Sequence, residues 1–401
     1  MINALVIIAA LGYFVDIYDL ILFSIVRVPS LQSLGLSGEA LLSQGLFILN
    51  AQMLGMLLGG IIWGVLGDKK GRLSVLFGSI LLYSLANLAN AFVTNVPAYA
   101  LLRFVAGIGL AGELGAGITL VMETLPKSKR GIGATIVASF GVAGAILAGV
   151  IAEYFSWRMA YGIGGVMGLL LLVLRVSAFE SGLYQDAEKK KVKRGAFLSL
   201  FKRVPVAARY LKCILIGLPL WYVIGVLVTF SPEIALALGI TEPVHAGRAV
   251  MFCYGGLIVG DLASGFLSQW LQSRKKAICF FLLLMGITGS IYLFLIQGYS
   301  AWAVYWICLG LGFSSGYWVL FVTVGAESFG TNYRATVATT VPNFVRGAVV
   351  PIGLLFKSLK QTMGIVNSGA VVGALCIAIA FLSLITLEET FHKDMDFLEE
   401  L

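Results

Sequence analysis

The stretch SQGLFILNAQMLGMLLGGIIWGVLGDKKGR, residues 43–72, joins a long apolar run to a short, highly charged loop. Its apolar part, 43–66, exceeds the roughly 20 residues that a helix needs to cross the hydrocarbon core of a bilayer. Similar runs recur along the whole chain, so we expect about twelve membrane-spanning helices. The predicted spans are 4–28, 43–66, 73–94, 97–121, 132–154, 157–176, 211–236, 247–271, 277–296, 300–325, 336–357 and 366–387.

Composition agrees with a protein whose solvent is mostly lipid. Of 401 residues, 59% are hydrophobic and only 12% are charged, and the mean hydropathy is +0.95. That is too little polar surface to cover a water-soluble protein of this length. The sequence therefore predicts an integral membrane protein, with the lipid bilayer as its main partner.

The formal net charge of +8 has a better explanation than nucleic-acid binding. The basic residues form short clusters between apolar runs and make no extended basic face with interleaved aromatics, so we expect no nucleic-acid partner. Each cluster follows an even-numbered span, which by the positive-inside rule places both termini and the central loop in the cytoplasm of a bacterial inner membrane. The clusters lie within 69–72, 127–130, 189–194, 202–209 and 274–276.

An internal repeat divides the chain into halves. Residues 123–130, ETLPKSKR, follow the fourth span, and residues 327–334, ESFGTNYR, follow the tenth. Two similar six-helix units related by an axis along the membrane normal explain this spacing. We expect an N-terminal bundle at 1–176, a cytoplasmic loop at 177–210 and a C-terminal bundle with a short tail at 211–401.

The loop GVLGDKKGR, residues 64–72, resembles the signature of the major facilitator superfamily, Gly-x-x-x-Asp-Arg-x-Gly-Arg. The resemblance implies an all-α membrane fold of about twelve transmembrane helices in two six-helix bundles. It also implies that this loop latches the cytoplasmic side during alternating access. The second copy, 265–275, has lost its carboxylate, so we expect weaker latching there. The expected gating residues are Gly64, Asp68, Gly71, Arg72, Glu123, Arg130, Glu327 and Arg334.

Two further motifs are similar to the metabolite:proton symporter and organic-ion branch of that superfamily. They are Asp16-Ile-Tyr-Asp19 in the first span and a glycine-rich stretch from Arg103 to Glu113 in the fourth. The resemblance implies proton-coupled symport of an organic acid, zwitterion or similar metabolite. Residues 141–149 lack the Gly-Pro pair of the family's drug exporters, which favours uptake. Export of drugs, siderophores or metabolites is the alternative, and a non-transporting receptor is a remote one.

Charged residues inside the first and fourth spans are the first functional candidates, because each costs about 2.5–3.5 kcal/mol at the bilayer centre. Asp16 and Asp19 are three residues apart and share one helix face. We expect an ion pair between Asp19 and Arg103, with Asp16 or Glu113 as the group that binds the transported proton. The alternative is a purely structural network.

In the second half we expect a buried pair between Asp261 and Arg346, or a contact of Arg346 with an anionic substrate. Aromatic and amide side chains on the helices that line the family's cavity are the other candidates for substrate contact, and Tyr317 ranks first among them. The expected cavity residues are Tyr18, Trp221, Tyr222, Tyr317, Trp318, Asn343 and Arg346.

Nothing in the sequence indicates an enzyme. The two histidines, His245 and His392, lie outside the predicted spans, and no metal-ligand or nucleophile arrangement is present. The five cysteines show no paired spacing. We therefore expect no cofactor and no metal. The other expected partners are a small-molecule substrate and protons, bound by a monomer.

Overall fold

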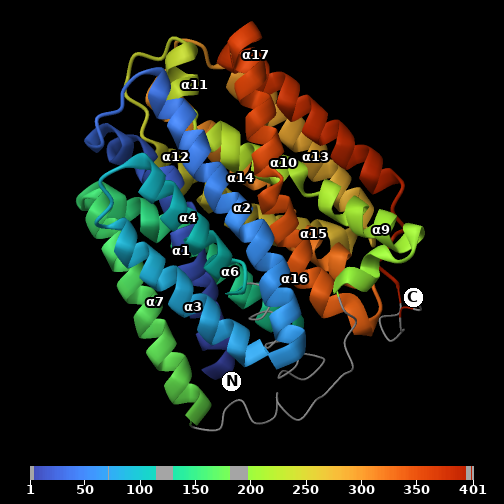
Figure 1. The fold of residues 1–401 in the computed structure, drawn as a ribbon. Coiled ribbons are helices and arrows are strands. Elements are labelled where there is room, and N and C mark those ends of the chain that lie inside the picture. Colours follow the sequence, from blue (N-terminus) through green and yellow to red (C-terminus); the bar gives the residue numbers. More distant parts are fainter. Residues whose placement is uncertain (1–3, 71, 114–129, 181–196, 394–398, 400–401) are drawn as a thin grey trace.

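The protein is described here by a computed structural model covering residues 4–70, 72–113, 130–180, 197–393 and 399 (Figure 1). Within these residues the secondary structure is helical, with no strand. Eight helices are long and apolar enough to cross a membrane, and shorter apolar helices accompany them. The all-α membrane fold predicted from the sequence is confirmed.

The helices of the first half run up and down between short loops, and they occupy the first six predicted spans. Residues 114–121 of the fourth span lie outside the described part of the chain. The helices are α1 (Ala4–Ser33), α2 (Glu39–Lys70), α3 (Arg72–Asn90), α4 (Val96–Leu110), α6 (Arg130–Tyr154) and α7 (Trp157–Glu180).

The second half follows the same plan with more interrupted helices. A short 3-10 helix, η2 (Phe197–Phe201), precedes it. Gly364, with φ of 79°, divides α17 into the end of the eleventh span and the whole of the twelfth. The helices are α9 (Val204–Leu215), α10 (Leu218–Tyr222), η3 (Val223–Val228), α11 (Ser231–Ala237), α12 (Ala246–Trp270), α13 (Arg274–Ser290), η4 (Ile291–Leu295), α14 (Ala301–Ser314), α15 (Trp318–Glu327), α16 (Thr331–Gly347) and α17 (Val349–Ile385).

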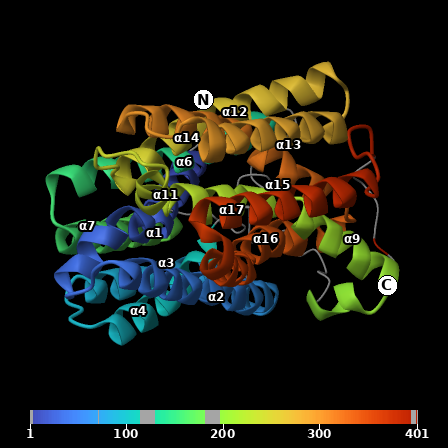
Figure 2. The same cartoon turned by 90° about the horizontal axis from the view of Figure 1, so that it is seen from above.

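The two ends of the bundle need names, because the site is described relative to them. We call the end at which α2 finishes and α13 begins, near Lys70 and Arg274, the basic end. The opposite end, at which α1 finishes and α7 begins, near Ser33 and Trp157, is the distal end. Seen from above in Figure 2, α2–α4 lie along one edge of the molecule and α12–α14 along the opposite edge.

The halves meet through helices that carry small residues. A Cβ atom added to Gly60 of α2 would lie 3.0 Å from the Asn343 side chain of α16, and one at Gly149 of α6 would lie 2.2 Å from Met251 of α12. Within each half the approach is as close, since a Cβ at Gly55 would lie 2.1 Å from the Phe104 carbonyl oxygen. In lipid, where apolar burial drives little association, such close packing holds helices together.

Neighbouring glycines on α12 test this packing. A Cβ at Gly256 would lie 2.0 Å from the Leu309 carbonyl oxygen, whereas one at Gly255 meets nothing within 4 Å. We expect Gly256→Ala to lower the melting temperature of the purified protein by several degrees, because overpacking costs about 1–3 kcal/mol. Gly255→Ala should leave it unchanged or raise it slightly, since alanine favours helix. Equal effects of the two substitutions would contradict the packing described.

Candidate functional site

A small cavity lies between the two halves near the middle of the bundle. Tyr13 of α1 lines one side, and Trp221, Tyr254, Trp318 and Arg346 line the other. Its free volume is about 20 Å³, enough for about one water molecule. The structure thus places three predicted residues, Trp221, Trp318 and Arg346, on the cavity wall. Tyr13 and Tyr254 were not predicted.

Arg346 is the charged residue of this cavity and is almost fully buried. Its guanidinium carbon lies 5.9 Å from the ring centroid of Trp221 and 5.7 Å from that of Trp318. Nη1 donates to Oδ1 of Asn343 at 3.3 Å, and Nε has no hydrogen-bond partner. No carboxylate among the described residues lies within ion-pair distance of it.

The predicted pair between Asp261 and Arg346 is therefore wrong. Oδ1 of Asp261 instead accepts a hydrogen bond from the backbone N–H of Val319 at 3.2 Å. The chain breaks its helical hydrogen bonding between α14 and α15, and this leaves the first amides of α15 free to bind a carboxylate. Asp261 joins α12 to that helix start.

Three predicted aromatic residues do not face the cavity. Their hydroxyls donate to backbone carbonyls of neighbouring helices: Tyr18 to Ala160 at 2.8 Å, Tyr222 to Gly369 at 2.6 Å and Tyr317 to Ile216 at 3.1 Å. Consecutive residues of a helix point about 100° apart, so Trp318 reaches the cavity while Tyr317 turns towards α9. The prediction that these three residues line the cavity is therefore wrong.

Asn343 has a different position from the one expected. Its Nδ2 donates to the Ala111 carbonyl of the first half at 2.9 Å, and to Thr339 within its own helix at 3.0 Å. It therefore connects the two halves and orients Arg346 through its Oδ1. A contact of Asn343 with substrate stays a prediction.

The predicted ion pair between Asp19 and Arg103 is also absent. Nη2 of Arg103 donates to the backbone carbonyl of Asp19 at 3.1 Å, and the rest of the guanidinium contacts Oδ1 of Asn87 at 2.8 Å and Oε1 of Gln52 at 3.3 Å. Neutral acceptors thus surround this buried cation. Both carboxylate oxygens of Asp16 and both of Asp19 are buried without a hydrogen-bond partner.

Glu113 has a partner that the sequence interpretation missed. Arg175 of α7 donates to both of its carboxylate oxygens, with 3.0 Å between Nη1 and Oε2, and the pair is almost fully buried. Two parallel hydrogen bonds of this kind are the strongest contact available to a carboxylate. Arg175 lies just inside the predicted span 157–176. Its charge within this apolar run was the signal that could have identified it.

Ion pairs join the two halves across the distal end. Arg27 of α1 contacts Glu233 of α11 at 2.6 Å, and Nη2 also donates to the Thr229 carbonyl at 3.2 Å. The Arg27 guanidinium lies 4.4 Å from the Phe230 ring centroid and is fully buried. The other two pairs, Glu39 with Lys360 and Glu153 with Arg248, are each 2.5 Å apart. The structure is closed at the distal end.

The buried pair should contribute more to this closure than the exposed ones. Glu233→Gln leaves the Arg27 charge buried and unpaired, which is costly. We expect it to speed maleimide labelling of a cysteine introduced at Thr229 several-fold. The matched control is Glu39→Gln, because that carboxylate is 76% exposed and contributes little. Equal labelling in both variants would show that the buried pair does not hold the distal end shut.

Most of the predicted gate at the basic end falls outside the described residues. Gly71 and Glu123 lie there entirely, as do the side chains of Asp68, Arg72 and Arg130. Their latch role stays a prediction. Gly64 is described, and a Cβ there would lie 3.7 Å from Cγ2 of Thr340 on α16.

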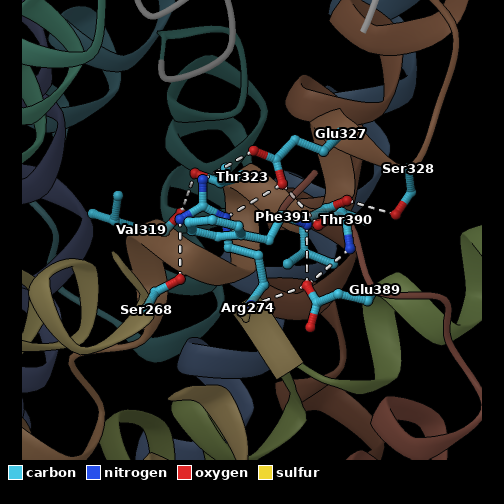
Figure 3. A network of polar contacts seen from close by, with 10 residues as sticks. Ser268, Arg274, Val319, Thr323, Glu327, Ser328, Glu389, Thr390 and Phe391 are labelled. Atoms are coloured by element: carbon cyan, nitrogen blue, oxygen red, sulfur yellow. Dashed lines mark hydrogen bonds and ion pairs between the residues drawn. The ribbon is translucent and has the colours of Figure 1, made fainter. Parts of the chain in front are cut away.

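The second copy of the gate is better connected than the sequence indicates. Arg274 contacts Glu327 at 3.2 Å, and Thr390 of the tail donates to Glu327 at 2.7 Å. Arg334 donates to the carbonyls of Ala326 and Phe329. Figure 3 shows Arg274, Glu327 and Thr390 of this network.

Glu389 of the tail supplies a carboxylate at the start of α13, in the copy that has lost its own. It accepts from the Ser273 hydroxyl and from the backbone N–H groups of Arg274 at 3.0 Å and Lys275 at 3.3 Å. Figure 3 shows Glu389 beside Arg274. Partial burial opposes ionisation of Glu389, yet these hydrogen bonds together hold its pKa below the usual range. The tail thus caps a helix of the C-terminal half.

This cap should depend on pH. Because the pKa of Glu389 is lowered by folding, its contribution to stability is present above the unfolded pKa and is lost as pH falls through the folded value. We expect Glu389→Gln to lower the melting temperature at pH 7 and the difference from wild type to shrink on acidification. The adjacent Glu388, 84% exposed, provides the control Glu388→Gln, which should change little. A pH-independent difference would contradict the cap.

Comparison with known proteins assigns the chain to a family. The sequence model of the Major Facilitator Superfamily matches residues 9–354, and the chain belongs to that superfamily. It is 25% identical to the gentisate transporter of Corynebacterium glutamicum over 407 residues, covering 94% of this chain and 87% of that one. It is 36% identical to the 4-hydroxybenzoate transporter PcaK of Pseudomonas putida over 143 residues, covering 34% and 32%.

The solved structure of the xylose transporter XylE from E. coli, in an inward open conformation, has the same fold. Its TM-score is 0.74 at 16% identity, with 99% of this chain and 98% of that chain covered. The protein is thus an integral membrane transporter for a small organic solute. This agrees with the fold class and the general function predicted from the sequence.

Proposed function

We propose that this transporter carries a small aromatic carboxylate into the cell together with protons. The observation that carries the proposal is Arg346, a buried cation in the central cavity without a carboxylate partner. A planar guanidinium binds a carboxylate through two parallel hydrogen bonds. Its position between the two halves is the position that a solute must pass in alternating access.

The walls of the cavity favour an aromatic solute. The ring centroids of Trp221 and Trp318 lie 5.9 Å and 5.7 Å from the Arg346 guanidinium, and ring faces of this kind stack well on another ring. Nε1 of Trp221 is buried without a hydrogen-bond partner, so it can donate to a polar group of the solute. The related transporters of gentisate and 4-hydroxybenzoate are named for hydroxylated aromatic acids, which supports this class.

Proton coupling is proposed to act through Asp16. Its carboxylate has no hydrogen-bond partner, and it is close enough to Arg346 for the two charges to attract each other. An anion bound at Arg346 would screen that attraction and make the protonated form of Asp16 more favourable. Solute and proton would then bind together and leave together, which is the requirement for symport. Asp19 is the second coupling candidate, and the Glu113–Arg175 pair fixes the helices around both.

Orientation, boundaries and assembly remain part of the proposal. We place the basic end and both termini in the cytoplasm of a bacterial inner membrane, following the positive-inside rule. The bundles are 1–176 and 211–401, with the loop 177–210 between them. The transporter acts as a monomer on small solutes and binds no nucleic acid. The residues at the basic end, including Asp68, Arg72 and Glu327, are proposed to open and close that side.

The experiment is solute uptake into proteoliposomes with an acidic exterior. Gentisate and 4-hydroxybenzoate are the probes, and benzamide is the uncharged comparison. We expect accumulation of the acids that disappears when the pH gradient is abolished. Arg346→Gln should abolish acid uptake and the thermal stabilisation that the acids give. Tyr317→Phe, a buried aromatic away from the cavity, should retain both.

Two results would overturn the proposal. Stabilisation of Arg346→Gln by the acids as strongly as wild type would remove Arg346 from the solute site. Acid uptake that is insensitive to the pH gradient in the wild type would remove proton coupling.

A further inference from the structure

Unpaired polar groups gather in the interior of the N-terminal half, and most of them lie outside the central cavity. Asp16, Asp19, Tyr83, Ser84 and Asn87 are each 0% exposed. Both oxygens of each carboxylate, the Tyr83 and Ser84 hydroxyls and Nδ2 of Asn87 have no hydrogen-bond partner in the described protein. In a membrane, each unsatisfied polar group costs several kcal/mol, so such a cluster calls for water.

These groups form a column along the helices. Tyr83, Asn87 and Asn90 follow one face of α3 at spacings of four and three residues. Oδ1 of Asn90, at the distal end of that face, is also buried and unpaired. The Tyr83 hydroxyl lies within Coulomb range of Asp16 and Asp19 of α1. Arg103 of α4 donates to Oδ1 of Asn87 on α3 at 2.8 Å and to the Asp19 carbonyl of α1 at 3.1 Å. The column therefore lies between α1 and α3, beside this guanidinium.

Glycines of α7 border the column on its third side. A Cβ at Gly168 would lie 2.0 Å from Oγ of Ser84, and one at Gly164 would lie 3.1 Å from Oδ1 of Asp19. A larger residue at either position would crowd these polar atoms. The missing side chains let α7 pack directly against the polar groups of the column.

The column has polar ends in both directions. Towards the basic end it meets the Glu113–Arg175 pair, whose atoms pack against Gly12 of α1. Towards the distal end the Tyr161 and Tyr99 hydroxyls lie 2.8 Å apart, and Tyr99 donates to Oγ of Ser30 at 3.4 Å. From Arg175 to Tyr161 along α7 is about 21 Å at 1.5 Å per residue, against a hydrocarbon core of about 30 Å.

Charges inside this part of the protein favour the uptake of one proton. Three buried carboxylates, Asp16, Asp19 and Glu113, face two buried guanidiniums, Arg103 and Arg175, among the described residues. Arg346 of the other half balances the third carboxylate, so an anion bound at Arg346 leaves one negative charge in excess, which one bound proton would neutralise. Arg346 faces Asp16 from the other half and Tyr13, Tyr18, Tyr83 and Tyr161 contribute hydroxyls around α1.

Asp16 stands between this column and the central cavity. Tyr13 and Ile17, one turn apart on α1, line the cavity. Asp16, three residues after Tyr13, lies at the edge of that face, and Asp19 lies further round the helix. Asp16 is close enough to Arg346, Glu113 and Arg175 for its charge to interact with theirs. Helix α1 thus separates the column from the central cavity, and the Asp16 carboxylate lies next to both.

We propose that this column is a water-filled proton path, separate from the solute path, that connects the distal end to Asp16 past Asn90, Asn87, Asp19 and Tyr83. A proton bound to water at the distal end moves along the hydrogen-bonded chain, and the last water gives its proton to the Asp16 carboxylate. The proposal rests on the proton coupling proposed above. It adds the route by which the proton reaches Asp16, and this route passes through neither the central cavity nor Arg346.

The test compares coupled transport with exchange in proteoliposomes that contain a pH-sensitive dye. Tyr83→Phe removes one hydroxyl of the column and keeps the ring, and Ser84→Ala is a second, smaller change. We expect both to slow proton influx and gradient-driven uptake of 4-hydroxybenzoate several-fold. Counterflow of the solute, which needs no net proton movement, should stay near the wild-type rate. Tyr317→Phe is the control, because its hydroxyl bonds a backbone carbonyl outside the column.

The possible results distinguish an error in the proposed proton route from an error in the proposed proton coupling. If wild-type protein shows solute-dependent proton influx and both variants match it, the route is wrong while the coupling stands. If counterflow falls as much as proton influx, the hydroxyls support the fold and the route is again wrong. If wild-type protein shows no proton influx with solute, the coupling fails and the route fails with it.

Discussion

A carboxylate held among membrane helices must find a cation, hydrogen-bond donors or water, and this constraint organises the whole structure. Glu113 meets it with Arg175, Glu233 with Arg27 and Asp261 with a backbone amide of α15. The carboxylates of Asp16 and Asp19 have no hydrogen-bond partner among the described residues. This contrast is why we propose static roles for the first set and proton binding for Asp16 and Asp19.

The two halves contribute different polar groups to the interior of the protein. The N-terminal half encloses a column of polar groups along α1, α3 and α7, whereas the C-terminal half presents Arg346 and two tryptophans to the cavity. Asp16 adjoins both regions. With the distal end closed and the cavity only large enough for about one water, solute binding requires the halves to separate. In the proposed mechanism, the attraction between Asp16 and Arg346 across the boundary of the halves couples solute to proton.

Sequence reasoning reached the twelve spans and the superfamily because span length and the loop at 64–72 are local properties. Of the residues it proposed for solute contact, Trp221, Trp318 and Arg346 line the central cavity of the structure, and their contact with solute stays a prediction. It failed wherever helix rotation decides a partner: Tyr317 turns away while Trp318 faces inward, and Arg103 reaches a carbonyl of Asp19 and not its carboxylate. Arg27 and Arg175 were missed because charges near span ends usually reach the interface, yet here both are buried.

The most direct test of this account is a structure of the protein in lipid nanodiscs at a resolution that shows ordered water. The account predicts water density within hydrogen-bond distance of the Asp16 and Asp19 carboxylates, continuing beside Tyr83 towards Asn90. Dry packing, in which these groups find donors from other side chains and no water lies between α1 and α3, would contradict it.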